Sequence, residues 1–429
     1  MTAAEDEVVE LCRDLIRIDT SNPTSDERAA AEYVAAKLAE VGIESTLVES
    51  APGRASVIAR VEGADPSRGA LLMHGHLDVV PADASEWTFD PFGGEIRDGC
   101  LWGRGAIDMK DFDAVILAVA REFGRTGRNP PRDIVFGFLA DEEAGGRFGS
   151  HWLVQNRRDL FDGVTEAITE GGGVSFDLGN GQRLYPIENA QRGQAWLRLI
   201  ATGRAGHGSS PNDENAVTDL AESLARIGRH RFPVRLIEPV RGLLERAAEL
   251  LGVEFDPSDV DASLAKMGPV AELVDVILRN SANPTMIEGG YQTNVIPGRA
   301  TAAVDGRFLP GHEQELLDTV DSLLLPSVRR EFIHHDVAMQ TEFAGTLVDA
   351  MCAAIRAEDP DGHPTPYCNA GGTDNKAFAT IGINGFGFKA LRVPPDLPYA
   401  RMFHGVDERI PLESLRFSTR VMRRLLETC

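Results

Sequence analysis

The sequence predicts an α/β fold in which a sheet is covered by helices on both faces, with a smaller α/β sandwich inserted into the middle of the chain. Strand-like and helix-like segments alternate through the first part, as is typical of such sheets. Near residue 190 the pattern changes, and from Glu342 the first rhythm returns. We therefore expect one domain from residues 1–189 and 341–429 and an inserted domain from residues 190–340.

Helical and apolar periodicity predicts the elements of the first domain. Glu7–Ile18 and Asp26–Val41 place apolar residues at helical spacing, and Ala114–Phe123 predicts a third helix. Short apolar runs predict strands at Ser56–Val61, Ala70–Met73 and Ile134–Ala140.

The inserted domain is predicted from two strand–helix units. The first unit is an alternating strand and a helix that follow one another across a Gly- and Ser-rich turn at Gly203–Pro211. A long, mostly helical stretch precedes the second unit. The strands are expected at Gln194–Thr202, Met286–Gly290 and Arg299–Phe308, and the helices at Asn215–Ile227 and Glu313–Leu325.

Composition excludes several classes of protein. The 429 residues are 43% hydrophobic and 25% charged, which is an ordinary globular mixture. A net charge of −23 argues against nucleic acid or an anionic membrane as a partner. The longest aliphatic run, Ala114–Ala120, is too short to span a bilayer. Five cysteines without a CxxC spacing, and a start without a basic and apolar leader, favour a cytoplasmic protein.

Two motifs place metal-binding side chains after an apolar strand and before a helix. His76 and Asp78 follow the strand at 70–73, where open α/β sheets present ligands. The imidazole can bind a metal while the carboxylate orients it, although a histidine there is more often structural, as we expect for His74. Asp108 precedes a helix, where it can cap the helix or bridge two divalent cations.

Three further motifs place acids and a histidine beside glycines. Asp141, Glu142 and Glu143 follow a buried-looking strand, so they form either a solvated turn or a metal ligand next to a general base. Glu170 and His404 lie in similar surroundings and are weak signals singly. Together the five motifs offer two imidazoles and three carboxylates, a set that suits two zinc ions with a shared Asp.

The order of these motifs resembles metallopeptidase family 20, the di-zinc amidohydrolases that include aminoacylase, succinyl-diaminopimelate desuccinylase, glutamate carboxypeptidase and carboxypeptidase S. The resemblance runs nearly from end to end. The matching segments are His76–Pro81, Trp87, Pro91–Phe92, Asp98–Gly99, Gly103–Gly105, Asp108–Lys110, Asp141–Glu143, Glu170–Gly171, Gly206–Ser209, Asn294–Gly298, Gly371–Asp374 and His404–Glu408.

The resemblance implies a fold and a role for each residue. It implies a zinc-peptidase-like catalytic domain with a mixed sheet, and an inserted lid that forms a homodimer. His76 and Glu170 would complete one zinc site and Glu143 and His404 the other, with Asp108 shared and Co²⁺ or Mn²⁺ as substitutes. Asp78 would orient His76, and Glu142 would take a proton from the bridging water. The family usually has Gly at the position of Asp111.

The resemblance also implies a substrate site. His207 would polarise the scissile carbonyl, in the manner of an oxyanion-hole donor. Asn294 would donate to the substrate, or simply form an Asx turn. Arg307 would hold an α-carboxylate, and main-chain N–H groups of the Gly371–Gly372–Thr373 segment would form a small anion nest for it.

The sequence therefore predicts a zinc-dependent hydrolase acting on an amide bond next to a free α-carboxylate. Its substrates would be N-acyl amino acids, dipeptides or a peptide C-terminus. One alternative is a carbamoyl-amide hydrolase on the same fold, and another is a catalytically silent binding protein. The silent protein is disfavoured because all six ligand and base positions are intact.

Overall fold

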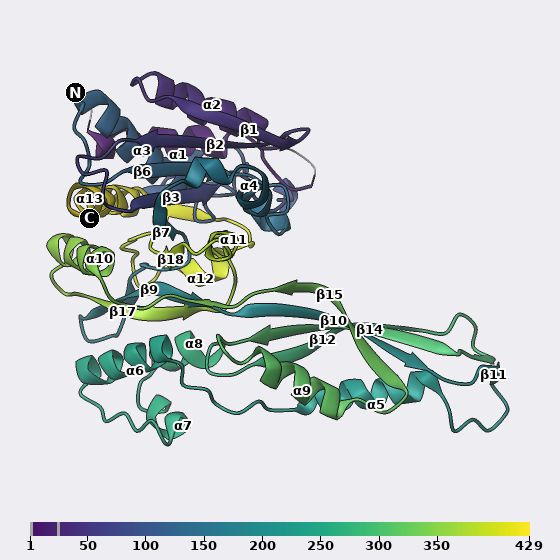
Figure 1. Ribbon diagram of the computed structural model, residues 1–429. Coiled ribbons are helices and arrows are strands. Elements are labelled where there is room, and N and C mark those ends of the chain that lie inside the picture. Colours follow the sequence, from purple (N-terminus) through teal and green to yellow (C-terminus); the bar gives the residue numbers. More distant parts are fainter. Residues whose placement is uncertain (1–2, 24–25) are drawn as a thin grey trace. The chain divides into compact units, whose positions relative to one another are not determined.

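The computed structural model describes residues 3–23 and 26–429 (Figure 1). The chain forms two compact units. The first unit contains the chain up to Asn189 together with Thr341–Tyr367 and Thr373–Cys429, and the second contains Ala190–Gln340 and Cys368–Gly372. No helix among residues 3–23 and 26–429 is long and apolar enough to cross a membrane.

Eight helices and three 3₁₀ turns are described in the first unit. The helices are α1 (Ala4–Ile16), α2 (Arg28–Ala39), α3 (Lys110–Thr126), α4 (Ser150–Asn156), α10 (Thr346–Glu358), α11 (Asn375–Ala379), α12 (Tyr399–Met402) and α13 (Leu412–Thr428). The 3₁₀ turns are η1 (Ala84–Glu86), η2 (Glu142–Ala144) and η3 (Arg158–Phe161).

A mixed sheet with the strand order β1-β2-β6-β3-β7-β18-β9-β16 forms the centre of the fold, and β8 and β17 also pair with β9. Its strands are β1 (Ser45–Ala51), β2 (Arg54–Val61), β3 (Ala70–His76), β6 (Ile134–Leu139), β7 (Val164–Thr169), β8 (Phe176–Asp177), β9 (Arg183–Gln191), β16 (Met339–Gln340), β17 (Gly362–Asn369) and β18 (Asn384–Gly387). A separate three-stranded sheet contains β4 (Glu95–Arg97), β5 (Cys100–Trp102) and β19 (Arg409–Pro411).

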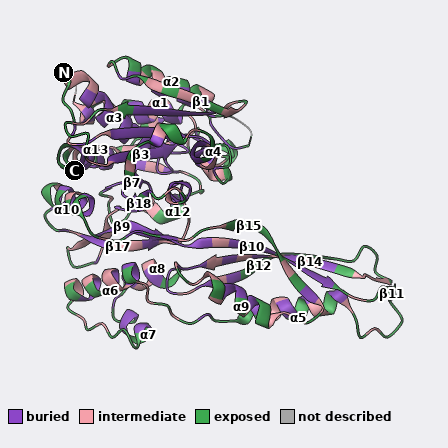
Figure 2. Cartoon of the chain, in the orientation of Figure 1, coloured by how far each residue is buried: buried purple, intermediate pink, exposed green. Residues whose placement is uncertain are grey.

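Both faces of the central strands are buried (Figure 2). On β3, Leu71 and Met73 pack into a core with helices α1, α3 and α13, whereas Leu72 packs on the opposite face near α4 and α11. All seven residues of β3 are buried. A strand covered on both faces reads as a continuous apolar run, which explains why this strand was predictable from its sequence.

The second unit is built on a four-stranded antiparallel sheet with the order β12-β14-β10-β15. Helices α5 and α9 pack on one face of this sheet through an apolar core that includes Leu197, Leu220 and Leu316. The strands are β10 (Gly193–Thr202), β11 (Gly206–His207), β12 (Ser281–Gly289), β13 (Val295–Ile296), β14 (Arg299–Phe308) and β15 (Val328–Asp336), and the helices are α5 (Ala216–Arg229), α6 (Glu238–Leu251), α7 (Val260–Leu264), α8 (Pro269–Asp275) and α9 (Glu313–Leu323).

The α/β fold class is confirmed, and most predicted elements are present with small shifts at their ends. The strand predicted at Arg299–Phe308 is β14 with the same bounds, and the helix predicted from Asn215 is α5, whose N-cap is Asn215. The capping reading of Asp108 is wrong, because Met109 occupies the N-cap of α3 and Lys110 begins the helix.

Candidate metal centre

Three neighbouring parallel strands deliver the acids and one histidine to the same sheet edge. The strands β6, β3 and β7 are adjacent and parallel, so their carboxyl ends lie together. His76 is the last residue of β3, Glu142 and Glu143 lie in the turn after β6, and Glu170 follows β7 directly. This edge is where open α/β sheets bind ligands.

Two segments outside the sheet complete the group. Asp108 lies just before α3, and His404 follows α12. The backbone of His404 has a φ of 56° and that of Asp141, before η2, has a φ of 70°. Left-handed backbone is uncommon for residues with a side chain, and it concentrates at functional sites.

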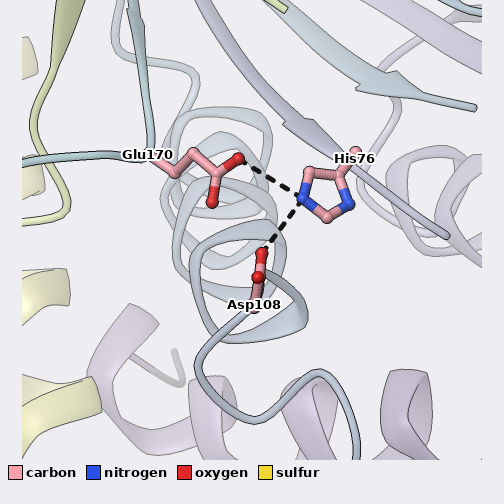
Figure 3. Close-up of side chains that lie close together, drawn as sticks. All are labelled: His76, Asp108 and Glu170. Atoms are coloured by element: carbon pink, nitrogen blue, oxygen red, sulfur yellow. Dashed lines mark ion pairs between the residues drawn. The ribbon is translucent and has the colours of Figure 1, made fainter. Parts of the chain in front are cut away.

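His76, Asp108 and Glu170 form the first cluster (Figure 3). The Nε2 atom of His76 lies 3.2 Å from Oδ1 of Asp108 and 3.4 Å from Oε1 of Glu170. All three side chains are buried. A Cβ atom at Gly387 would lie 2.3 Å from the carbonyl oxygen of Glu170, so glycine allows β18 to pass close to this ligand.

Asp108, Glu143 and His404 form the second cluster. The Nε2 atom of His404 lies 3.3 Å from Oδ2 of Asp108 and 3.2 Å from Oε2 of Glu143. The two oxygens of Asp108 thus face different histidines, Oδ1 toward His76 and Oδ2 toward His404. This division is the arrangement that a carboxylate shared between two cations requires.

The donor set fits two divalent cations. Each cluster contains one imidazole and two carboxylates, including the shared one, and nitrogen and oxygen donors of this kind suit zinc and neighbouring transition metals. The buried Nε2 of His76 and Oε1 of Glu143 have no hydrogen-bond partner among residues 3–23 and 26–429. Buried polar atoms without a partner are costly, and a bound cation would satisfy them.

The charges of the cluster shift the pKa values of its members. Contacts with Asp108 and Glu143 raise the pKa of His404 to about 10, against the effect of burial. Burial opposes ionisation of Asp108, but the close imidazoles of His404 and His76 lower the pKa of this carboxyl. Burial raises the pKa of Glu142 well above its usual value, and the nearby carboxylate of Glu170 adds to this increase.

Asp78 contacts the centre differently from the prediction. The hydrogen-bond partner of His76 Nδ1 is the main-chain oxygen of Asp78, at 2.9 Å, whereas its carboxylate lies 3.7 Å from that nitrogen. The carboxylate instead accepts the main-chain N–H groups of Glu142 and Glu143, at 3.1 Å and 3.0 Å. It also accepts a bond from the Asn22 side chain at 2.6 Å. Asp78 therefore fixes the turn after β6, and the main chain orients His76.

The predicted substrate residues lie largely in the second unit. His207 and Asn294 are exposed on a small ribbon formed by β11 and β13, and the Nδ1 atom of His207 lies 2.8 Å from Ser209 Oγ. Arg307 forms an ion pair with Asp305, with a nitrogen–oxygen distance of 2.8 Å.

In the Gly371–Gly372–Thr373 segment, one predicted nest donor is already used. The N–H of Gly371 donates to the side chain of Asn369 at 3.1 Å. Thr373 Oγ1 accepts the N–H of Asn375 at 3.2 Å.

Several buried polar residues near the ligands were not predicted to act. Asn22 contacts Asp78, and Asp374 bonds to the hydroxyl of Ser150, while burial raises the pKa of Asp374 to about 7. Lys389 contacts Asp111. His74 is structural, as expected, with Nε2 3.0 Å from Asn375 Oδ1.

A mixed α/β fold with two groups of candidate metal ligands that share one aspartate is typical of metallopeptidases and amidohydrolases. The sequence pattern of Peptidase family M20/M25/M40 matches residues 72–428, and the chain belongs to this family. The predicted family and enzyme class are confirmed.

Individual relatives are similar over most of the chain. Aminoacylase-1 of Sus scrofa is 28% identical over 418 residues, which cover 94% of this chain and 90% of that protein. The M20 family metallo-carboxypeptidase Sso-CP2 from Sulfolobus solfataricus has a TM-score of 0.73 at 19% identity, covering 99% of both chains. The Bacillus subtilis YXEP protein, a dinuclear metal binding peptidase, has a TM-score of 0.60 at 14% identity, again covering 99% of both chains.

Proposed function

We propose that the protein is a zinc-dependent hydrolase that cleaves an amide or peptide bond next to a free α-carboxylate. The observation that carries this proposal is that the two oxygens of the Asp108 carboxylate face different histidines. Oδ1 lies 3.2 Å from Nε2 of His76, and Oδ2 lies 3.3 Å from Nε2 of His404. His76 and Glu170 would hold one cation, and Glu143 and His404 the other. Two bound cations would polarise the scissile carbonyl and make water more acidic.

Glu142 is the proposed general base. It lies in the η2 turn next to Glu143, and its Oε2 is 4.0 Å from Nε2 of His76 in the first cluster. Its raised pKa, caused by burial, suits a group that accepts a proton from water and passes it to the leaving nitrogen. Glu143, one residue later, lies against His404 and is left for metal binding.

The proposed substrates are N-acyl amino acids, dipeptides or peptide C-termini. Similarity to an aminoacylase and a metallo-carboxypeptidase supports this class, because the names of both relatives describe hydrolysis of an amide bond. Within the substrate site, Asn294, Arg307 and the Gly371–Thr373 segment would contact the carboxylate end, and His207 the scissile carbonyl. For Arg307, this role requires exchange of its partner Asp305 for the substrate.

We further propose that the second unit is a lid that pairs with a second copy of the chain. The exposed edge strand β12 supports this, because an unpaired strand edge favours association. The cytoplasm remains the proposed compartment, supported by five free cysteines.

The test is a hydrolysis screen with and without metal. The purified protein is treated with a chelator, and N-acetyl amino acids, dipeptides and N-carbamoyl amino acids are offered after adding Zn²⁺, Co²⁺ or Mn²⁺. We expect no turnover without metal. Activity should return as about two ions bind to each chain, and N-acyl amino acids or dipeptides should be the substrates that are hydrolysed. Turnover of N-carbamoyl substrates alone would favour the carbamoyl-amide alternative, and full activity in metal-free protein would refute the mechanism.

A further inference from the structure

The main chain just before Asp108 is held on both sides by charged side chains. The N–H of Ile107 donates to Oε1 of Glu408 at 2.7 Å. The carbonyl oxygen of Ile107 accepts a bond from Nζ of Lys389 at 2.6 Å. Ile107, Glu408 and Lys389 are all buried. Each polar group of this one residue is therefore paired with a buried charge, where such bonds are strongest.

Each of the two charges has its own counter-charge. Arg104 donates to Oε2 of Glu408 at 2.7 Å, and Lys389 lies 2.8 Å from Oδ1 of Asp111. Burial alone would lower the pKa of Lys389, but Asp111 and other nearby acidic groups, including Glu170, together raise it above its usual value, so the amine stays charged. Removing one partner of a buried ion pair leaves an uncompensated charge, so each pair is held together by the cost of breaking it.

The same contacts join the segments that carry the metal ligands. Glu408 lies four residues after His404, and Arg104 also donates to the carbonyl oxygen of Gly405 at 2.9 Å. Asp111 lies in the first turn of α3, and Lys389 follows β18. The acid at position 111 is thus half of a buried ion pair with Lys389.

We propose that Lys389 and Glu408 are positioning residues that hold Ile107 and thereby set the bridging orientation of the Asp108 carboxylate. The inference rests on the proposed metal centre. An aspartate side chain has two rotatable bonds, so its oxygens can reach two cations only if its main chain is fixed. Metal–ligand distances must be correct to about 0.2 Å, and groups that orient ligands typically change metal affinity 10–100-fold.

Lys110 provides a matched control. It is also a buried lysine next to Asp108, and its Nζ donates to two main-chain oxygens, Leu15 at 3.0 Å and Ile18 at 2.7 Å. These oxygens belong to the end of α1 and the segment after it, not to Ile107. Its removal would therefore lower stability in a similar way without releasing the segment before Asp108.

The experiment compares Lys389→Met, Lys110→Met and the pair Asp111→Asn/Lys389→Met with the full-length wild type. The double variant removes both charges of the pair and leaves no unpaired buried charge. It is therefore expected to fold even if Lys389→Met alone does not. Zinc affinity is measured by competition with a chromophoric chelator, and the cobalt-loaded proteins are compared by visible absorption. Thermal unfolding of metal-free protein measures stability separately.

We expect the wild type to bind two cations, and both variants that lack Lys389 to bind at least one of them about 10–100-fold more weakly. Their cobalt spectra should differ from that of wild type, whereas Lys110→Met should lose stability and keep wild-type affinity and spectrum. If both Lys389 variants keep the wild-type affinity and spectrum, the positioning role is overturned, but the proposed metal centre is not. Equal loss in Lys110→Met would also overturn it, since any loosening of the fold would then suffice. A wild type that binds no second cation would overturn the metal centre itself.

Discussion

The side chains at this centre differ in their contacts and in their exposure to solvent. Glu142 and Glu143 are neighbours, yet Glu143 lies 3.2 Å from the candidate ligand His404, whereas Glu142 lies 4.0 Å from His76. His76 is buried, whereas His404 is exposed. These differences follow from the direction in which each side chain leaves a turn or strand end, so roles can be separated by substitutions that conserve shape.

The division between base and ligand can be tested with two isosteric variants. Glu142→Gln keeps the size of the side chain but cannot accept a proton, so we expect turnover to fall by about 10²–10⁴-fold with two metal ions retained. Glu143→Gln should instead lose metal, because an amide is a poorer ligand than a carboxylate. Turnover and metal content are measured on the same samples. Equal metal content with equal loss of turnover would contradict the assignment.

The pKa of His404 predicts that metal binding depends on pH. In the metal-free protein its pKa is raised to about 10 by Asp108 and Glu143, so at pH 7 the imidazole carries a proton that a cation must displace. Apparent affinity should therefore rise with pH between 7 and 9, by about tenfold per unit for each proton released. Calorimetry in buffers of different ionisation enthalpy counts these protons. Binding without proton release would show that His404 is neutral or is not a ligand.

Local sequence signals could indicate the candidate metal ligands but not the residues that support them. Histidines and acids beside glycines, just after apolar strands, are visible within short windows of sequence. The contact between Asp111 and Lys389 joins residues 278 positions apart, and no local pattern reports it. The same is true of Asn22, which reaches Asp78 across 56 positions. Supporting residues are defined by tertiary contacts, and a single sequence does not contain these contacts in readable form.

At the scale of elements, strands with a clear burial pattern were predictable, whereas others, such as β9 and β15, were not. Strand β9 contains Pro186 and the buried polar residues Glu188, Asn189 and Gln191, so it lacks both a continuous apolar run and an alternation. Strand β15, an edge strand with the sequence VRREFIHHD, is exposed along most of its length. Hydrophobic periodicity reports burial of apolar side chains, and neither strand satisfies that condition.

The η2 turn is the element on which the proposed base depends, and Asp78 holds it. Asp78→Asn keeps the shape, but one amide oxygen cannot accept the three bonds that reach the carboxylate from Asn22, Glu142 and Glu143. We expect activity to fall about 10–100-fold. Asp83→Asn is the control, because Asp83 likewise accepts an N–H at the start of a 3₁₀ turn but is exposed. Loss of activity is measured as kcat/KM, and equal values for both variants would refute the role of Asp78.

At the scale of the whole molecule, the second unit offers an unpaired sheet edge. In β12, Met286 is 61% and Ile287 60% exposed, and Tyr291 just beyond the strand is 81% exposed. Adjacent exposed apolar residues on an edge strand favour association, and the proposed twofold pairing would cover the same residues in both copies. A charge placed there by Ile287→Lys should therefore give a monomer, whereas Val276→Lys, at an exposed position outside the edge strands, should not.

The proposed pairing through β12 leads to a prediction about which copy supplies His207. Both residues of β11, Gly206 and His207, are exposed, so His207 is free to contact a second copy of the chain. If it serves the partner's metal centre, His207→Ala and Glu142→Gln, each inactive alone, should complement each other when mixed. One of the two sites in every mixed dimer then has both groups, so random exchange should restore about a quarter of wild-type activity. Introducing Ile287→Lys into both variants should abolish the recovery. Activity is assayed after subunit exchange has been demonstrated with labelled protein, and no recovery at that point would mean that His207 acts within its own chain or has no part in the reaction.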